Sequence, residues 1–322
     1  MKYLTSRPLH ILLLLISLLH LLQGAAMAET QIGILLFSEE ARYTDALKGI
    51  QDQLLADGFK APGTVLTVEN ARANKARGAE LVQKFAAAKY DLIFSLGTST
   101  TIPLAREIKD VPIVFSIVYD PVESGIAKDW KSSGNNTTGT YTRIPMALVL
   151  QKLKKLGPIQ RLAALYTPGE KNSELQVQDL QEAQADFGIK VVPVPLTSKQ
   201  EVAQMLPEIL RTSDALFLTG SNLVNSQTEL IVDQANRAKV ITITHLEDLV
   251  EKGALIGVCA NSYKLGRLAG EKGSKVLQGE KPLSLPIETL STLDVILNMK
   301  SVAQGQFEIS QEIKELVSRT IQ

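Results

Sequence analysis

The chain has 322 residues, of which 45% are hydrophobic and 21% charged, and its 34 basic residues balance its 34 acidic ones. This balance gives no support to a nucleic-acid partner, which calls for a basic excess, and the single cysteine excludes an internal disulfide. The length favours two domains of about 100–150 residues each over one core.

Residues 1–28 have the pattern of a cleaved secretory signal peptide. Lys2 and Arg7 precede an apolar run over residues 9–22, and Ala26-Met27-Ala28 has the small residues of a cleavage site. The run is shorter than the roughly 20 apolar residues of a membrane span, and no cysteine lies nearby to carry a lipid. The sequence predicts a periplasmic mature chain of 294 residues (322 minus 28). Its net charge is near −2, because 32 basic residues (34 minus Lys2 and Arg7) face 34 acidic ones.

From Gln31 onward, short apolar runs alternate with segments of helical periodicity. The runs are continuous, as in strands buried on both faces of a parallel sheet. The first half predicts strands near Gln31–Leu36, Thr64–Val68, Asp91–Leu96, Val111–Val118 and Thr137–Tyr141. The second half repeats this plan near Arg161–Tyr166, Ile189–Pro193, Ala215–Thr219, Val240–Thr244 and Ala254–Cys259. The sequence therefore predicts an α/β protein with two doubly wound parallel-sheet domains.

The chain continues beyond the second half, with a helical stretch over Tyr263–Leu277 and an apolar run over Leu293–Met299. A chain that crosses between its domains more than once would use this tail to complete both of them. We expect residues 29–141 and 261–284 to form one lobe, and residues 142–260 and 285–322 to form the other. Repeated crossings make a multi-strand hinge.

Ligands of open parallel sheets bind beyond the carboxyl ends of the strands, and polar residues gather there in this chain. Gly97-Thr98-Ser99-Thr100-Thr101 is the most distinct group. A glycine-hydroxyl turn at a helix start offers backbone N–H groups and a positive dipole end to an anion. Thr98 or Ser99 has the alternative role of a helix cap. The turn lacks the lysine and spacing of a nucleotide phosphate loop, so no nucleotide cofactor is indicated.

Asp120 ends an apolar strand, where a carboxylate has no packing reason to be, and accepts a hydrogen bond from a ligand if it faces the cleft. The alternative is an ordinary Asp-Pro turn with Pro121. Ser173 and Asn222 likewise either contact ligand or cap the helices that follow them.

His245 is the only histidine of the mature chain, which excludes a histidine-rich metal site. A strand-end or interface role is the more common one for such a residue. An enzyme needs an activated acid, base or metal, and the only pair available is Asp120 with His245. We therefore expect no catalytic residues, no metal and no cofactor. Cys259 is expected to be a small buried residue at a strand end.

Several segments together resemble one known family: the substrate-binding proteins of ABC importers with the type I periplasmic-binding fold, in the branch that includes tryptophan and tyrosine binders. The resemblance covers nearly all of the mature chain. It rests on the order and spacing of residues 91–101, 111–115, 120–122, 136–139, 166–173, 252–255 and 265–267.

The resemblance implies two lobes, three hinge strands and a cleft that closes on a small ligand and is read by an ABC permease. Position by position, it puts the ligand contacts on Thr98, Ser99, Asp120, Asn172, Ser173, Ser221 and Asn222. The chain departs from the family where Ser221-Asn222 replaces Asp-Asn and where Thr244-His245-Leu246 lacks an aspartate. These carboxylates would meet an amino-acid ammonium, so their loss puts an amino-acid ligand in doubt. We expect a monomer; a receptor kinase is the alternative partner, and the ligand itself is not identified.

Overall fold

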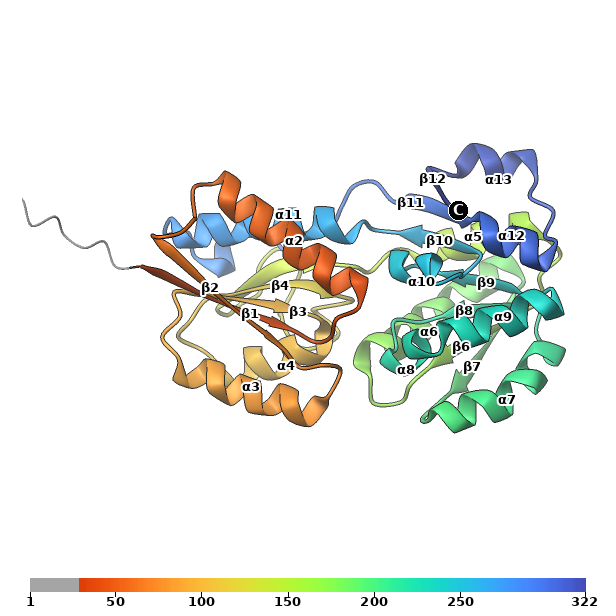
Figure 1. Ribbon diagram of the computed structural model, residues 1–322, viewed down its shortest axis with the longest axis horizontal. Coiled ribbons are helices and arrows are strands. Elements are labelled where there is room, and N and C mark those ends of the chain that lie inside the picture. Colours follow the sequence, from red (N-terminus) through yellow and green to blue (C-terminus); the bar gives the residue numbers. More distant parts are fainter. Residues whose placement is uncertain (1–28) are drawn as a thin grey trace, which may run out of the picture.

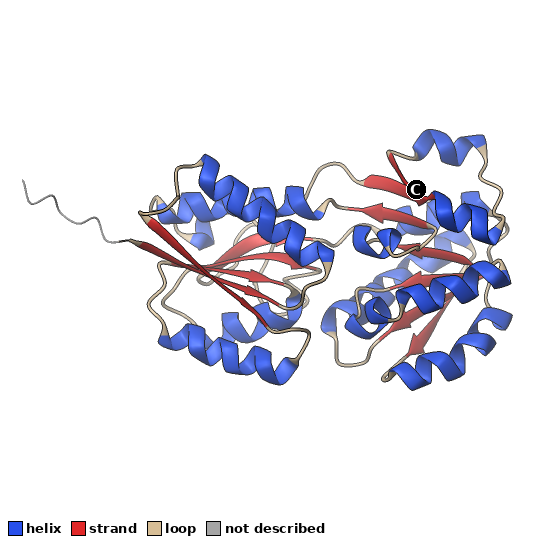
Figure 2. Ribbon diagram, viewed as in Figure 1, coloured by secondary structure: helices blue, strands red, loops and turns tan. Residues whose placement is uncertain are grey.

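The computed structural model describes residues 29–322, and the predicted signal peptide, residues 1–28, lies outside them. The described chain forms two α/β lobes side by side, each with helices on both faces of a central sheet (Figures 1 and 2). Within residues 29–322, no helix has both the length and the apolar character needed to cross a membrane.

The first lobe is built on a five-stranded parallel sheet of order β2-β1-β3-β4-β5. Its inner strands are continuous apolar runs that are buried along their whole length, as the sequence predicts for a sheet covered on both faces. The strands are β1 (Thr30–Leu36), β2 (Thr64–Asn70), β3 (Leu92–Leu96), β4 (Ile113–Val118) and β5 (Thr137–Tyr141), and the helices are α2 (Ala41–Ala56), α3 (Lys75–Ala87), α4 (Thr98–Glu107) and α11 (Ser262–Leu277).

The second lobe contains a seven-stranded sheet of order β12-β11-β10-β9-β8-β6-β7. Its strands are β6 (Arg161–Tyr166), β7 (Lys190–Pro195), β8 (Ala215–Leu218), β9 (Ile241–Thr244), β10 (Ile256–Cys259), β11 (Asp294–Asn298) and β12 (Arg319–Ile321). Its helices are α5 (Met146–Leu156), α6 (Lys171–Ala183), α7 (Lys199–Thr212), α8 (Asn222–Ser226), α9 (Thr228–Ala238), α10 (Glu247–Glu251), α12 (Met299–Gly305) and α13 (Gln311–Leu316). Two 3₁₀ turns, Gln184–Phe187 in this lobe and Pro282–Ser284 beyond α11, complete the secondary structure.

Both lobes have the same core topology. In each, the first strand lies between the second and the third, followed by the fourth and fifth, and β11 adds an antiparallel strand to the second sheet. The predicted architecture of two doubly wound α/β domains is confirmed by this strand order. In this topology the crevice lies where the strand order reverses, beyond the carboxyl ends of β1 and β3 in one lobe and of β6 and β8 in the other.

The chain crosses between the lobes three times. It leaves the first lobe after β5, returns after β10 so that α11 packs against α2, and leaves again before β11 pairs with β10. Along the last crossing, Ile287 N–H donates to the Trp130 carbonyl at 2.9 Å and Glu288 pairs with Thr140 of β5. The chain therefore stays with the first lobe a few residues beyond the boundary at 284/285 that the sequence suggests.

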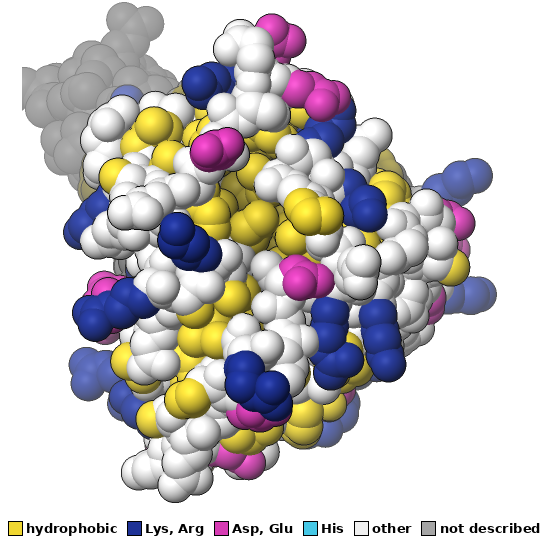
Figure 3. Space-filling model, turned by 90° about the vertical axis from the view of Figure 1, so that its right-hand side faces the viewer, with side chains coloured by type: hydrophobic (Ala, Val, Ile, Leu, Met, Phe, Trp, Pro, Cys, Tyr) yellow, Lys and Arg dark blue, Asp and Glu magenta, His cyan; other side chains and the backbone are white. Residues whose placement is uncertain are grey.

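The outer end of the second lobe is made by the carboxyl-terminal segment. Cys259 is fully buried there at the end of β10, beside Val250 and Ile296, as expected of a small apolar residue. Figure 3 faces this end and shows apolar side chains exposed between charged ones. An apolar groove at this end is lined by Leu297, Met299, Val302, Phe307, Ile309 and Val317.

Candidate functional site

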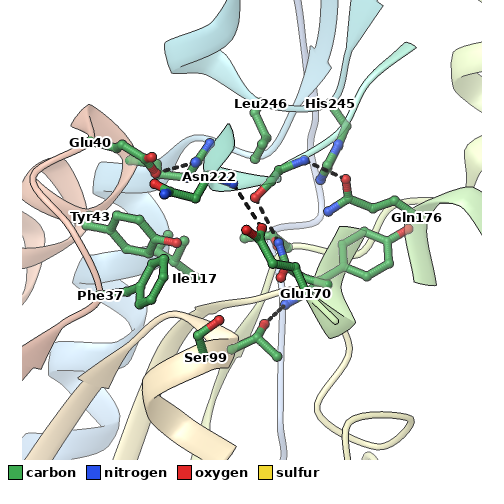
Figure 4. Close-up of a pocket in the computed structure, with 16 residues that line it drawn as sticks. Phe37, Glu40, Tyr43, Ser99, Ile117, Glu170, Gln176, Asn222, His245 and Leu246 are labelled. Carbon is green, nitrogen blue, oxygen red and sulfur yellow. Dashed lines mark hydrogen bonds and ion pairs between the residues drawn. The ribbon is translucent and has the colours of Figure 1, made fainter. Parts of the chain in front are cut away.

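A pocket lies between the two lobes, at the carboxyl ends of their strands (Figure 4). It contains about 430 Å³ of empty space when the open solvent at its mouth is included, and it is lined by side chains of both lobes. The first lobe contributes Phe37, Glu40, Arg42, Tyr43, Thr98, Ser99, Ile117, Tyr119 and Thr142; the second contributes Glu170, Asn172, Gln176, Gly220, Asn222, His245 and Leu246. The pocket therefore lies where the strand order reverses in both sheets.

The amino terminus of α4 forms one polar wall. Gly97, between β3 and α4, has φ 110°, and a Cβ there would lie 3.0 Å from Cε1 of Tyr43. A residue other than glycine would therefore be strained and crowded at this turn. The N–H groups of Thr98 and Ser99 are in the first turn of the helix, where no intrahelical acceptor exists. They present donors and the positive end of the helix dipole to the pocket, an arrangement that suits a carboxylate.

An apolar wall lies beside this turn. The rings of Phe37 and Tyr43 meet edge to face, with centroids 6.3 Å apart. Ile117 completes the wall with φ 55°, a left-handed conformation that a β-branched side chain rarely adopts. The distortion coincides with a register shift between β4 and β5. Figure 4 shows these three side chains on one side of the pocket, facing the polar groups of the second lobe.

Glu170 brings a carboxylate to the opposite wall. Its Oε2 accepts a hydrogen bond from the Asn222 N–H at 2.9 Å, and its side chain is only 9% exposed. Burial raises the pKa of Glu170, while the Asn222 N–H and the Lys75 ammonium oppose that shift. The carboxylate is held in place at the start of α6, where it can meet a cationic group in the cleft.

Two amides flank Glu170 and fix the loop after β8. Asn172 Nδ2 donates to the Gly220 carbonyl at 2.9 Å, and Gln176 Oε1 accepts from the Gly220 N–H at 2.7 Å. Both backbone groups of Gly220 are thereby satisfied by side chains of α6. The bonds hold Asn222, at the start of α8, against the pocket.

A buried ion pair bridges the lobes at the rim of the pocket. Arg42, the second residue of α2, lies with its guanidinium Nη1 3.1 Å from Oδ2 of Asp248 on α10, and both side chains are 3% exposed. Glu40 pairs with the other end of the guanidinium, and Asn225 Nδ2 donates to Asp248 at 3.0 Å. Burial alone would lower the pKa of Arg42, but the Asp248 and Glu40 carboxylates outweigh it and raise that pKa.

His245 follows β9 and is 2% exposed. Its ring lies edge-on to Tyr119, with centroids 5.4 Å apart, and stacks on Phe217 at 6.0 Å. Neither Nδ1 nor Nε2 has a hydrogen-bond partner among residues 29–322. Burial, with a smaller contribution from the charge of Arg42, lowers the pKa of His245 to about 3, so the imidazole is neutral.

Residues 31–321 match the family model of the ABC transporter substrate binding proteins. The chain belongs to this family. The family assignment made from the sequence is therefore confirmed, and this substrate-binding protein can be compared with its relatives.

A tyrosine-binding protein of Clostridioides difficile (strain R20291) is 29% identical over 273 residues, which cover 84% of this chain and 79% of that protein. A crystal structure from Streptococcus pneumoniae in complex with L-Trp is 25% identical, with a TM-score of 0.86 over 91% of this chain and all of that one. A ligand-free, open substrate-binding protein with adhesive properties from Clostridium difficile is 30% identical, with a TM-score of 0.72 over 91% of this chain and 99% of that one.

The lobes of this substrate-binding protein are arranged more like those of the L-Trp complex than those of the open relative. The open relative is more similar in sequence, yet its TM-score is lower, 0.72 against 0.86. Two contacts across the cleft agree with a closed arrangement: the Arg42–Asp248 pair, and Lys75 Nζ, which donates to the Gly169 carbonyl at 3.0 Å.

The residues singled out in the sequence divide into two groups. Thr98, Ser99, Asn172 and Asn222 line the pocket, two from each lobe. Ser173 and Ser221 do not line it. Ser173 Oγ donates to the Thr167 and Glu170 carbonyls, while Ser221 Oγ caps α8 and lies 2.6 Å from Thr167 Oγ1. These two hydroxyls hold the loops that carry Glu170 and Asn222.

Asp120 also lies outside the pocket, and its carboxylate is fully engaged. Oδ1 accepts from the N–H groups of Val122 and Glu123 at 2.9 Å, and Oδ2 accepts from Arg143 at 2.5 Å. The first two bonds are those of a turn stabilised by an aspartate, which is the alternative that the Asp-Pro sequence allows. Among residues 29–322, no hydrogen bond joins Asp120 to His245.

Arg143 connects Asp120 of the first lobe to the second lobe. Its guanidinium also donates to Asp179 of α6 at 2.7 and 2.9 Å, and Tyr119 Oη donates to the same carboxylate at 2.6 Å. Tyr119 lines the pocket and also packs in the core of the second lobe. Trp130 lies on the first lobe, with its ring 4.6 Å from that of Tyr141.

The sequence reasoning missed Glu170, Gln176 and Arg42. Glu170 lies within the segment 166–173 that carries the family resemblance, only two residues before Asn172. Gln176 is one helical turn beyond Asn172, so helical spacing places both on the same face of α6. Arg42 has no local signal, because its partner Asp248 is 206 residues away.

Proposed function

We propose that this protein is the solute-binding component of an ABC import system and takes up an amino-acid-like ligand, with an aromatic L-amino acid as the best candidate. Its mature form is a monomer that works in the periplasm, closes on one ligand per molecule and delivers it to a permease. The family membership and the two amino-acid-binding relatives support this proposal.

The observation that carries the proposal is the pair of opposite polar ends in one pocket. The first turn of α4, with Thr98 and Ser99, offers N–H donors for a carboxylate, and Glu170 offers a carboxylate for an ammonium. Glu170 supplies an acidic group in place of the carboxylates that are missing at Ser221-Asn222 and Thr244-His245-Leu246. Between the two ends, Phe37 and Tyr43 offer aromatic surface for a flat side chain.

Glu170→Gln is expected to weaken binding of L-tryptophan or L-tyrosine by about 1.5–3 kcal/mol, roughly 10- to 150-fold in Kd, because the ammonium loses a charged acceptor. Isothermal titration calorimetry measures the change. Glu182→Gln, on the exposed face of the same helix, is the matched control and should leave Kd unchanged. Equal affinities of the Glu170→Gln and wild-type proteins would show that the ligand ammonium does not bind Glu170. Failure of the wild type to bind any aromatic amino acid would contradict the proposed ligand class.

Export requires loss of the leader. The Ala26-Met27-Ala28 site predicts that the protein recovered from the periplasm begins at Glu29. Amino-terminal sequencing of periplasmic material tests this, with the cytoplasmic fraction as its control. A retained leader would contradict the proposed route.

A further inference from the structure

His245 is a buried polar side chain at the binding pocket, and its ring nitrogens have no hydrogen-bond partner among the described residues. The residue is only 2% exposed. Buried polar groups in folded proteins are nearly always paired, so an unpaired one calls for a specific reason. Its position supplies one, since His245 lines the pocket between the lobes, next to Gln176 in Figure 4.

The ring cannot turn away from this position easily. It is stacked on Phe217 and held edge-on by Tyr119, and Tyr119 is itself fixed by its hydrogen bond to Asp179. Two aromatic neighbours leave the nitrogens without an acceptor or donor from the protein. When the lobes are apart, water can reach the pocket and pair with them. When the lobes close, only a ligand can do so.

The charge around the ring decides what kind of group it can meet. Besides His245, the titratable residues that line the pocket are Arg42, Glu40, Glu170, Tyr43 and Tyr119, and Asp248 pairs with Arg42. Arg42 disfavours a second cation, and the imidazole stays neutral, with one N–H donor and one acceptor nitrogen. A neutral ring of this kind suits a hydroxyl or a ring N–H better than a carboxylate or an ammonium.

We propose that His245 is a specificity-determining residue that hydrogen-bonds a neutral polar group, a hydroxyl or a ring N–H, on the side chain of the ligand. This inference rests on the function proposed above, in which the α4 turn and Glu170 hold the carboxylate and the ammonium. A ligand side chain without such a group leaves His245 unpaired in the closed state and binds less tightly.

The test is calorimetric titration of the wild-type protein with L-tyrosine, L-tryptophan and L-phenylalanine. Phenylalanine has the same aromatic bulk as tyrosine but no hydrogen-bonding group on its ring. We expect tyrosine, tryptophan or both to bind roughly 10- to 100-fold more tightly than phenylalanine. His245→Leu should reduce this preference to less than about threefold, while His245→Gln, which keeps a donor and an acceptor, should retain part of it.

A second measurement does not depend on a variant that folds. His245 is the only histidine of residues 29–322, so ¹⁵N-labelled histidine gives one pair of ring nitrogen signals from the processed chain. Saturation with tyrosine or tryptophan should shift at least one of them, because a new hydrogen bond changes the shielding of that nitrogen.

Three outcomes separate this inference from the function it rests on. If the wild type binds all three amino acids equally, or if ligand saturation leaves the ring signals unchanged, the role of His245 is wrong and the proposed function stands. If His245→Leu keeps the full preference, the discrimination comes from another residue. If none of the three binds, the proposed ligand class is wrong, and the inference fails with it.

Discussion

Asp248→Ala is expected to weaken ligand binding by about 3–5 kcal/mol, roughly 100- to 5,000-fold in Kd, although Asp248 does not line the pocket. In the closed protein the change leaves the Arg42 charge buried without its main partner. In the open protein the lobes are apart and water solvates Arg42. The penalty therefore falls on the closed state and appears as lost affinity.

The measurement is calorimetric titration with the aromatic amino acid that binds the wild type, beside small-angle scattering of the liganded protein. The control is the double variant Arg42→Met/Asp248→Leu, which removes both charges of the bridge and should regain part of the affinity, because only Glu40, with 12% of its side chain exposed, then loses its partner. An Asp248→Ala protein that binds as tightly as the wild type would show that the bridge does not help to hold the cleft closed. A double variant as weak as the single one would assign the loss to altered packing.

The strand positions could be predicted because burial on both faces leaves a strong local signal. The inner strands β3, β4, β6 and β8 are continuous apolar runs, and they lie within or next to the predicted ranges. By contrast, β12 is only three residues long and mostly exposed, so no apolar run marks it. It forms because β11 offers it a free parallel edge, which is a tertiary condition that local sequence does not contain.

The position of the pocket could be predicted from the sequence, but the hydrogen bonds and ion pairs around it could not. Ligands bind beyond the carboxyl ends of parallel strands, and this rule places Thr98, Ser99, Asn172 and Asn222 at the edge of the sheets where the pocket lies. The same rule places Asp120 at that edge without fixing its direction. Its carboxylate turns to Arg143, two residues beyond β5, because a hinge crossing brings that guanidinium within hydrogen-bonding distance. Arg42 and Asp248 come together only because the hinge places the two lobes face to face. The spacing of residues along the sequence therefore does not predict this pair.

The contact between α2 and α11 completes the first lobe. The two helices meet backbone to backbone at reciprocal glycines. A Cβ on Gly49 would lie 2.2 Å from the Tyr263 carbonyl oxygen, and a Cβ on Gly266 would lie 2.1 Å from the Ala46 carbonyl oxygen. Both obstacles are backbone atoms, which cannot rotate aside, so the helices must separate to admit any side chain. Because α11 belongs to the segment that returns from the second lobe, separation should loosen the first lobe only.

Gly49→Val is therefore expected to lower the free energy of unfolding of the first lobe by about 3–5 kcal/mol, against the gain of less than about 1 kcal/mol that replacing a helical glycine brings by itself. Trp130, the only tryptophan of the chain, packs on Tyr141 in the first lobe, so its fluorescence reports that lobe during urea unfolding. Circular dichroism reports both lobes together, and its midpoint should fall less than the fluorescence midpoint. Gly157→Ala is the matched control, because a Cβ there meets no atom within 4 Å, and it should change the free energy of unfolding from either probe by no more than about 0.5 kcal/mol. A Gly49→Val protein with an unchanged fluorescence midpoint would mean that α11 can move away from α2 without loss. The returning segment would then not be needed to hold the first lobe together.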